Sequence, residues 1–317
     1  MTMNLNIKAA QVRAMADAIV VEHPRMHVAH EQFEFLMEHG RRRHGQSKMG
    51  ALMVAPTQSG KSTIISSWAN RLNTLELEEQ RQIPVLHVTL SANVTCKGLA
   101  INILEAFEDR GIATGALSRG QTEAVLLARA QNHIRNAGVQ LLILDEFQHV
   151  IHSESHRLAH SVGEFIKRML ITGCCPIVLS GIEDARRPFE SNAQLRQRCL
   201  PPIELKPLRI TDPADAALFT DFIETYAAEL EHQGLGRDLK AIADNDLNMI
   251  CLLDVSDGVL GVACNLIKDA LQIAIKRGSQ AVLVGDLESA TDRLIASGCC
   301  DHNAFRHGPR ALSPRAA

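Results

Sequence analysis

The feature that most constrains this chain of 317 residues is a short segment between an apolar run and a helical pattern. Residues 55–63 read APTQSGKST, which matches the phosphate-binding pattern G-x-x-x-x-G-K-[ST] at every position except the first. In such a loop (P-loop), backbone N–H groups converge on phosphate oxygens at a helix N-terminus, the lysine reaches the β- and γ-phosphates, and a hydroxyl ligates Mg²⁺. Alanine replaces the first glycine, which is tolerated only where the backbone does not require a positive φ. The predicted site for ATP and Mg²⁺ consists of Ala55, Pro56, Thr57, Gln58, Ser59, Gly60, Lys61, Ser62 and Thr63.

Apolar runs and helical patterns alternate from residue 50 to about residue 208, which predicts a parallel sheet covered by helices. The run 139–144 is apolar almost throughout, as expected for a strand with both faces covered. We therefore expect an α/β P-loop NTPase fold, with a parallel sheet sandwiched by helices. The expected strands are 50–54, 84–90, 139–144, 176–180 and 202–208.

Helical patterns dominate on both sides of this region. Two lie before it, separated by Pro24, and several follow residue 212. The last residues contain two prolines and three arginines, a composition typical of a loose terminus. The expected domains are an N-terminal helical arm (1–45), a nucleotide-binding α/β domain (46–210), a small helical lid (211–298) and a flexible basic tail (299–317).

Composition excludes several classes of protein. Aromatic residues make up 3% of the chain, too few for a protein dedicated to stacking single-stranded bases. A formal net charge of −3 means that any nucleic-acid contact depends on a local basic strip. No signal sequence, C-x-x-C motif or membrane-spanning apolar run occurs, so the eight cysteines are expected to be reduced thiols of a cytoplasmic protein without membrane contact.

Candidate catalytic residues follow the expected strands. Asp145 and Glu146 end an apolar strand about 80 residues after the P-loop, where a P-loop protein holds Mg²⁺ and places a general base. Ser180 ends the next strand, and it either faces the γ-phosphate or begins a turn. Arg196 and Arg198 come just before the expected fifth strand, where an arginine can reach the γ-phosphate of a neighbouring subunit; the alternative is a solvated basic helix end.

Together these residues resemble the AAA+ ATPases, and more narrowly the TniB/TnsC family of transposition ATPases. The narrower resemblance depends on the P-loop, on LILDEFQHV at 142–150, on PIVLSGIEDARRPF at 176–189, and on LRQRC and IELKPL after it. The sequence HPR at 23–25 fits as well. The resemblance covers roughly residues 20–295.

The resemblance implies a function. Such proteins bind ATP between subunits, form rings or filaments of identical chains on double-stranded DNA, and connect a TniQ-like target selector to a DDE transposase. Hydrolysis then resets the assembly. By the same resemblance Asp145 and Glu146 are the Walker B pair and Ser180 occupies the sensor-1 position. Arg198 is then the better candidate for the arginine finger, and Arg196 is the second.

Two further departures from the family pattern concern hydrolysis. Cys199 stands where an aromatic residue often follows the finger arginine. The expected lid helix has no arginine at the sensor-2 position, and its nearest polar residues are Asn265 and Lys268. A weak sensor 2 predicts slow hydrolysis, stimulated by DNA or by a partner.

Basic residues in several places are candidates for DNA contact. The strongest basic run is Arg41-Arg42-Arg43, followed by His44 and Lys48. The alternative interpretation of this run is a solvated helix end favoured by the helix dipole. Arg186 and Arg187 are further candidates. The candidates carried forward are Arg41, Arg42, Arg43, Lys97 and Arg119.

Two other interpretations compete with a transposition ATPase: a P-loop kinase, or a signalling or scaffold NTPase that does not bind DNA. A zinc site at His152, His156 and His160 has suitable spacing on a helix, but a polar helix face is the favoured interpretation because no cysteine cluster completes the site.

Overall fold

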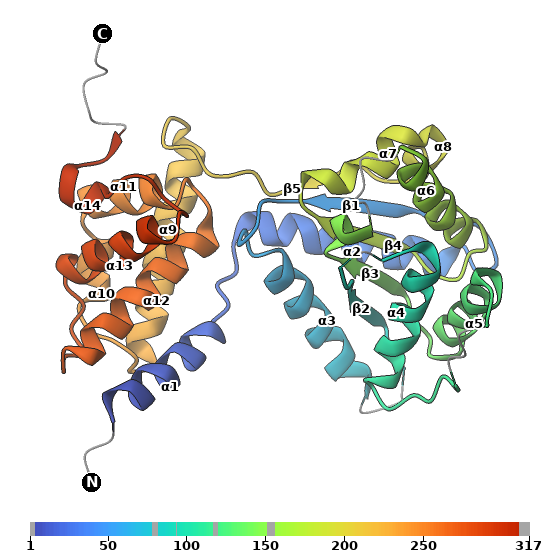
Figure 1. Ribbon diagram of the computed structural model, residues 1–317, viewed down its shortest axis with the longest axis horizontal. Helices are drawn as coiled ribbons and strands as arrows, with labels where there is room; N and C mark the ends of the chain where they lie inside the picture. The colour runs from blue at the N-terminus through green and yellow to red at the C-terminus, as the bar shows by residue number, and fades with distance from the viewer. Residues whose placement is uncertain (1–3, 78–81, 93, 117–119, 151–155, 311–317) are drawn as a thin grey trace. The chain divides into compact units, whose positions relative to one another are not determined.

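The computed structural model describes residues 4–77, 82–92, 94–116, 120–150 and 156–310 (Figure 1). The chain forms two compact units. The α/β unit comprises Arg25–Thr57 and Lys61–Leu205. The helical unit comprises the described residues of Met1–Pro24, Gln58–Gly60 and Lys206–Ala317.

The α/β unit is built on a parallel sheet in the order β2-β3-β4-β1-β5. Ile177 of β4 lies opposite both Gly50 of β1 and Leu142 of β3, so the three central strands begin at one edge and end at the other. The predicted fold class, a P-loop sheet between helices, is confirmed. The strands are β1 (Gly50–Val54), β2 (Val85–Thr89), β3 (Leu141–Asp145), β4 (Ile177–Gly181) and β5 (Ile203–Glu204).

Threonine side chains cap the starts of two helices of the α/β unit. The hydroxyl of Thr95 accepts the N–H of Gly98 at α4, and Thr122 does the same for α5. The helices are α2 (Pro24–Arg42), α3 (Lys61–Leu77), α4 (Cys96–Glu108), α5 (Glu123–Asn136), α6 (His156–Ile171), α7 (Arg187–Ser191) and α8 (Ala193–Arg196), with 3₁₀ turns η1 (Phe147–Val150) and η2 (Glu183–Arg186).

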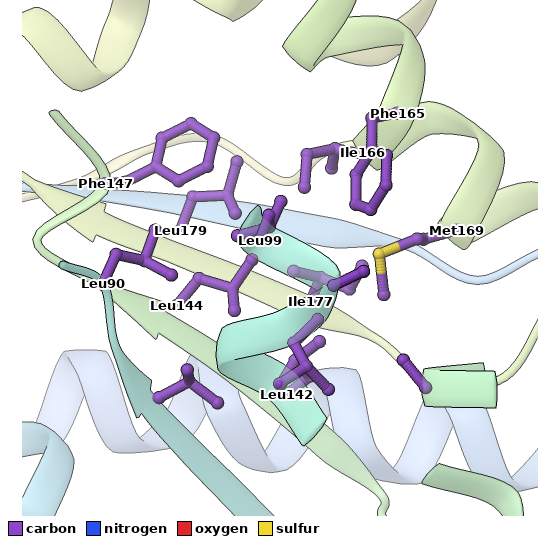
Figure 2. Packing of buried hydrophobic residues seen from close by; sticks show 14 of the residues in the cluster. Leu90, Leu99, Leu142, Leu144, Phe147, Phe165, Ile166, Met169, Ile177 and Leu179 are labelled. Atoms are coloured by element: carbon purple, nitrogen blue, oxygen red, sulfur yellow. The ribbon is translucent and has the colours of Figure 1, made fainter. Parts of the chain in front are cut away.

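Alternate residues of each strand face different cores, as the period of a strand requires. Leu142 and Leu144 face a cluster that includes residues of α4, α5 and α6, whereas Leu141 and Ile143 face a cluster formed with α2 and α3. Figure 2 shows the first cluster, where Leu142 and other strand residues meet Leu99 of α4 and side chains of α6. Burial on both faces explains why the strands are apolar almost throughout.

The helical unit is larger than the predicted lid. Its elements α1 and α9–α14 share one apolar core, to which α1 contributes Ala9, Val12 and Ala16. The helices are α1 (Leu5–Asp17), α9 (Pro213–His232), α10 (Leu239–Ala243), α11 (Asp246–Val255), α12 (Leu260–Lys276), α13 (Val284–Ala296) and α14 (Ala304–His307).

The structure divides the predicted N-terminal arm between the two units. Helix α1 packs on α12, where Arg13 donates to Asp269 at 2.5 Å and Lys268 donates to Asp17 at 2.7 Å. Most of helix α2 belongs to the α/β unit, where Phe33 and Leu36 are fully buried. The expectation of one arm over residues 1–45 therefore differs from the observed packing, because the two helices bury their apolar faces in different cores.

The expectation of a loose tail over 299–317 is wrong for residues 299–310. Arg306 of α14 pairs with Glu288 and Asp292, and Arg310 pairs with Asp254 and Asp301. These arginines bind acidic residues of the helical unit. Residues 311–317 lie outside the part of the chain that the structure describes.

Helix α11 was not predicted, because its sequence is apolar on nearly every face and shows no amphipathic period. Its start is capped by Asn245, whose side chain accepts the N–H of Asn248. Within the described residues no single helix could span a membrane; only α11 and α12 taken together, bent by 113°, meet the criteria of length and composition.

Candidate nucleotide-binding site

The P-loop connects the end of β1 to the start of α3. Gly60 has a φ of +88°, and a Cβ atom built there meets nothing within 4 Å, so the backbone at this position is open to a ligand. Ala55 is not among the residues with positive φ, whereas Gln58 is, at +60°. The glycine missing from the first motif position is therefore not required here.

Lys61 is the first residue of α3 and is buried beside the loop that precedes it. Its ammonium group donates to the carbonyl oxygens of Ala55 at 3.0 Å and Pro56 at 2.8 Å. Burial lowers the pKa of Lys61, and the nearby Glu146 and Asp145 carboxylates oppose that shift. The ammonium is thus held at the loop, with acidic partners at the end of β3.

Ser62 and Asp145 are brought together as the motif predicts. The Ser62 hydroxyl donates to Oδ2 of Asp145 at 2.9 Å, and the backbone N–H of Glu146 donates to Oδ1 at 2.9 Å. A hydroxyl and a carboxylate are hard oxygen ligands of the kind that Mg²⁺ prefers. The donor set therefore fits this ion.

The environment of Asp145 favours its ionised form. Burial raises the pKa of this carboxyl, but the nearby His87 and Ser180 side chains and hydrogen bonds from the Glu146 backbone and Ser62 together lower it to about 2. Nε2 of His87, on β2, lies 3.6 Å from Oδ2 of Asp145. An ionised carboxylate that is 1% exposed is well suited to attract a cation.

Glu146 directly follows β3 and has a left-handed backbone, with a φ of +56°. Non-glycine residues adopt this conformation rarely, and such strain gathers at functional sites. The chain then enters η1, which brings Gln148 back toward Glu146. The amide Nε2 of Gln148 donates to Oε2 of Glu146 at 2.5 Å.

Gln148 also binds the segment after β4. Its Oε1 accepts the N–H of Ile182 at 3.2 Å, and its side chain is 8% exposed. A Cβ atom on Gly181 would lie 2.5 Å from this Oε1, so glycine there makes room for the amide. Gln148 belongs to the run LILDEFQHV at 142–150, but the sequence predicts no role for it, because its position depends on the η1 turn. His149, in the same turn, places Nδ1 2.9 Å from the carbonyl oxygen of Leu90.

Ser180 lies in β4 and is fully buried. It is close enough to Asp145 to lower the pKa of that carboxyl. The carboxyl ends of β1, β3 and β4 thus bring together Lys61, Ser62, Asp145, Glu146 and Ser180. Their assigned roles in binding and catalysis stay predictions.

Arg198 lies at the opposite edge of the sheet. Its backbone oxygen accepts the N–H of Gly50, the first residue of β1, and the P-loop follows the last residue of that strand. Five residues of strand separate the two ends by roughly 13 Å. Arg198 is partly exposed and Arg196 is exposed. Neither arginine belongs to the cluster at the carboxyl ends of the strands.

The basic residues predicted to contact DNA differ in their exposure and in the partners that they already bind. Arg41 donates to Gln140 at 2.8 Å, and Arg41 and Arg42 both pair with Glu38 at the end of α2. Lys48 is not a surface cation, because it is 5% exposed and donates to the backbone oxygens of Gly40 and Arg43.

The other candidates lie elsewhere. Lys97 is in the first turn of α4, and Arg43 is exposed. Arg186 pairs with Glu183 and Glu204, and Arg187 pairs with Asp184. Arg119 lies outside the described residues, as does His152. Among the residues described, no cluster of three or more His, Cys, Asp and Glu side chains could hold a metal ion.

The polar residues considered for sensor 2 are bound to α1. Asn265 accepts a hydrogen bond from Arg13 at 3.0 Å, and Lys268 donates to Asp17. The amide of Asn265 also donates to Oε1 of Gln58 in the P-loop at 3.0 Å. This arrangement joins residues more than 200 positions apart, so no local pattern in the sequence predicts it.

Solved structures with the same fold share little sequence with this chain. Cdc6p from Pyrobaculum aerophilum is 12% identical with a TM-score of 0.59, over 87% of this chain and 68% of that one. ORC2 from Aeropyrum pernix, in ADPNP and ADP complexes, is 14% identical with a TM-score of 0.59, over 86% and 69%. ORC1 from Aeropyrum pernix, solved with DNA, is 16% identical with a TM-score of 0.56, over 86% and 66%. These similarities establish the AAA+ fold.

Comparison with curated protein sequences finds no significant match. A family model described as bacterial TniB protein matches residues 11–208. The match spans more than half of the chain and includes the P-loop, Asp145, Glu146, Ser180 and Arg198. The chain therefore belongs to the TniB family.

Proposed function

We propose that this protein is an ATPase that regulates DNA transposition by assembling on double-stranded DNA and recruiting a DDE transposase. The observation that carries the proposal is the pairing of Ser62 with the ionised, buried Asp145 beneath the P-loop, with Glu146 one residue further on. Membership of the TniB family supports the connection to transposition.

Each residue of the site has a role in the proposed hydrolysis. Lys61 leaves the carbonyl oxygens it now binds and contacts phosphate oxygens of ATP. Ser62 and Asp145 hold Mg²⁺, which when bound neutralises charge that develops on the phosphates. Glu146 accepts a proton from the attacking water, and Ser180 binds the γ-phosphate or that water.

Gln148 acts as a positioning residue for Glu146. Its amide donates to the carboxylate while its oxygen is held by the N–H of Ile182, so the carboxylate can adopt few other positions. Because Ile182 follows Ser180 by two residues, movement at Ser180 would also move the hydrogen-bond partner of Glu146.

The position of Arg198 supports hydrolysis between subunits. Roughly 13 Å of β1 separate it from the P-loop of its own chain, so its guanidinium is better placed to act on a neighbouring one. An arginine supplied in trans stabilises charge in the transition state, and turnover then requires a ring or filament of identical chains. Neither residue at the sensor-2 position is an arginine, and Lys268 is paired with Asp17 of α1, which is consistent with slow, stimulated hydrolysis.

DNA binding in this proposal depends on sequence-neutral phosphate contacts, with Arg41, Arg42, Arg43, Lys97 and Arg119 as candidates. Such contacts weaken steeply as salt rises. The structure solved with DNA among proteins of the same fold is compatible with this role. A TniQ-like selector and a transposase are the expected protein partners.

The test is sedimentation and electron microscopy of the protein with duplex DNA in ATP, a non-hydrolysable analogue, ADP or no nucleotide. We expect ATP-dependent assemblies on DNA of any sequence, which persist in Glu146→Gln. Arg198→Ala should keep ATP binding and lose turnover. Absence of DNA association in every nucleotide state at low salt would contradict the proposal and favour a kinase or a scaffold NTPase.

A further inference from the structure

The turn of the P-loop packs on the first turn of α12, within the helical unit. Residues Gln58–Gly60 belong to this unit by their contacts. A Cβ atom on Gly261, the second residue of α12, would lie 2.0 Å from the carbonyl oxygen of Gln58. No side chain fits at such a distance, so glycine at this position lets the helix reach the backbone of the loop.

A side chain of the same helix binds the side chain of Gln58. The amide Nδ2 of Asn265 donates to Oε1 of Gln58 at 3.0 Å, and Oδ1 of Asn265 accepts Nη2 of Arg13 at 3.0 Å. Because a guanidinium group can only donate, Arg13 turns the amide oxygen of Asn265 toward α1 and leaves the amide N–H groups for Gln58. Arg13 is itself held by Asp269.

Gln58 depends on support from its surroundings because its backbone is strained. Its φ is +60°, a left-handed conformation that is unfavourable for a residue with a side chain. Gly60 also has a positive φ, whereas Ser59 between them does not. Alternation of this kind turns successive backbone N–H groups toward one point and forms a concavity that binds anions. The phosphate-binding form of the loop thus requires a left-handed Gln58, which persists only where its neighbours hold it.

We propose that Gly261 and Asn265 are positioning residues of the P-loop. Helix α12 holds Gln58 in its left-handed conformation before ATP binds, and Arg13 of α1 orients the amide that does so. Ordering a loop in advance lowers the cost of binding, so these contacts raise the affinity for ATP. Asn265 acts through Gln58 rather than on the phosphates. The inference rests on the proposed binding of ATP at this loop and on no step that involves DNA.

Two glycines provide a matched test. Gly261 and Gly285 are each the second residue of a helix in the same unit, but a Cβ atom on Gly285 would meet nothing within 4 Å. Alanine favours a helix more than glycine does, so neither substitution should weaken its own helix. Gly261→Ala should nonetheless weaken ATP binding roughly tenfold, because the loop must move, whereas Gly285→Ala should leave the Kd unchanged. Titration of a fluorescent ATP analogue with Mg²⁺ into the full-length protein measures the Kd, and urea unfolding measures stability.

A double-mutant cycle tests whether Asn265 acts through Gln58. Asn265→Ala should weaken ATP binding by roughly fivefold, the contribution of one hydrogen bond. Gln58→Gly removes the side chain that Asn265 binds, and glycine adopts the left-handed conformation without support. In the Gln58→Gly background, Asn265→Ala should therefore have no further effect. Arg13→Ala should show the same dependence on Gln58 with a smaller loss. A merely structural role of Asn265 would give the same loss in both backgrounds.

Two results would overturn the inference. They are an unchanged affinity for ATP in Gly261→Ala, and a loss in Asn265→Ala that is equally large in the Gln58→Gly background. Lys61→Ala provides the reference for lost binding. If the wild-type protein binds ATP and Lys61→Ala does not, while Gly261→Ala and Asn265→Ala match the wild type, the inference fails alone and the proposed function stands. If the wild-type protein does not bind ATP, both are contradicted.

Discussion

The two units of the molecule differ in where their polar residues lie and in what those residues contact. In the α/β unit, Lys61, Asp145 and Gln148 are buried together where parallel strands end. In the helical unit the buried Asp286 is paired with Arg277, and the ends of the chain are held by more exposed pairs such as Arg13–Asp269. Buried polar groups thus form the candidate nucleotide site in one unit, whereas ion pairs hold the chain termini on helices in the other.

The largest effect that this comparison predicts is on nucleotide binding. Lys61→Ala removes a charged donor from the P-loop, which should weaken ATP binding by roughly 100-fold. The protein should remain folded, because the lost hydrogen bonds are to two loop carbonyls and no apolar contact of the core depends on them. Titration of a fluorescent ATP analogue measures the change, with circular dichroism as the folding control. Unchanged affinity would show that the buried polar cluster is structural.

A second prediction tests whether Gln148 positions the carboxylate of Glu146 or only stabilises the folded protein. Gln148→Leu should lower the ATPase kcat by roughly tenfold while the Kd for ATP stays unchanged, because the carboxylate of Glu146 loses its donor. Gln131→Leu is a matched control. Gln131 is also 8% exposed and donates to Thr172 at 2.8 Å, but it lies away from the site. Equal loss of turnover in both variants would indicate general destabilisation.

The sequence predicted the α/β unit well because its signals are local. An apolar run, a phosphate-binding loop and a helical pattern follow one another within about 25 residues, and Asp145 and Glu146 end the apolar run that forms β3. The role of Gln148 escaped notice because it depends on a left-handed Glu146 and on the turn that follows.

The helical unit was predicted less well because its organisation depends on distant contacts. Arg13 and Asp269 are 256 residues apart, and no periodic pattern connects them. Helix α11 lacks an amphipathic period, and the two prolines and three arginines of residues 299–317, Arg306 and Arg310 among them, are typical of a loose end. In the structure the same arginines have carboxylate partners on α11 and α13.

The third prediction concerns α1. Arg13→Ala removes a half-buried pair with Asp269 and the bond to Asn265, and it should lower the free energy of unfolding by about 1 kcal/mol. Burial raises the pKa of Asp17, but Lys268 and Arg13 lower it below the ordinary value of 3.8. The stability that the ionised Asp17 gains from Lys268 and Arg13 is therefore present above about pH 4. It is lost as the pH falls through the lowered pKa of Asp17.

Urea unfolding at pH 7 and at pH 3 measures this difference. The effect of Arg13→Ala should be smaller at pH 3, where Asp17 begins to take up a proton. An equal effect at both pH values would show that Arg13 stabilises α1 without its acidic partners.

The smallest effect is expected at the other end of the chain. Arg310 contacts Asp254 and Asp301, but its side chain is 46% exposed, so solvent screens these pairs. Arg310→Ala should cost roughly 0.5 kcal/mol or less, and most of the loss should disappear at high salt. Urea unfolding at low and at high salt checks this. A loss as large as that of Arg13→Ala would mean that both termini stabilise the helical unit equally. The expected difference instead follows from exposure, since the side chain of Arg13 is 27% exposed whereas that of Arg310 is 46% exposed.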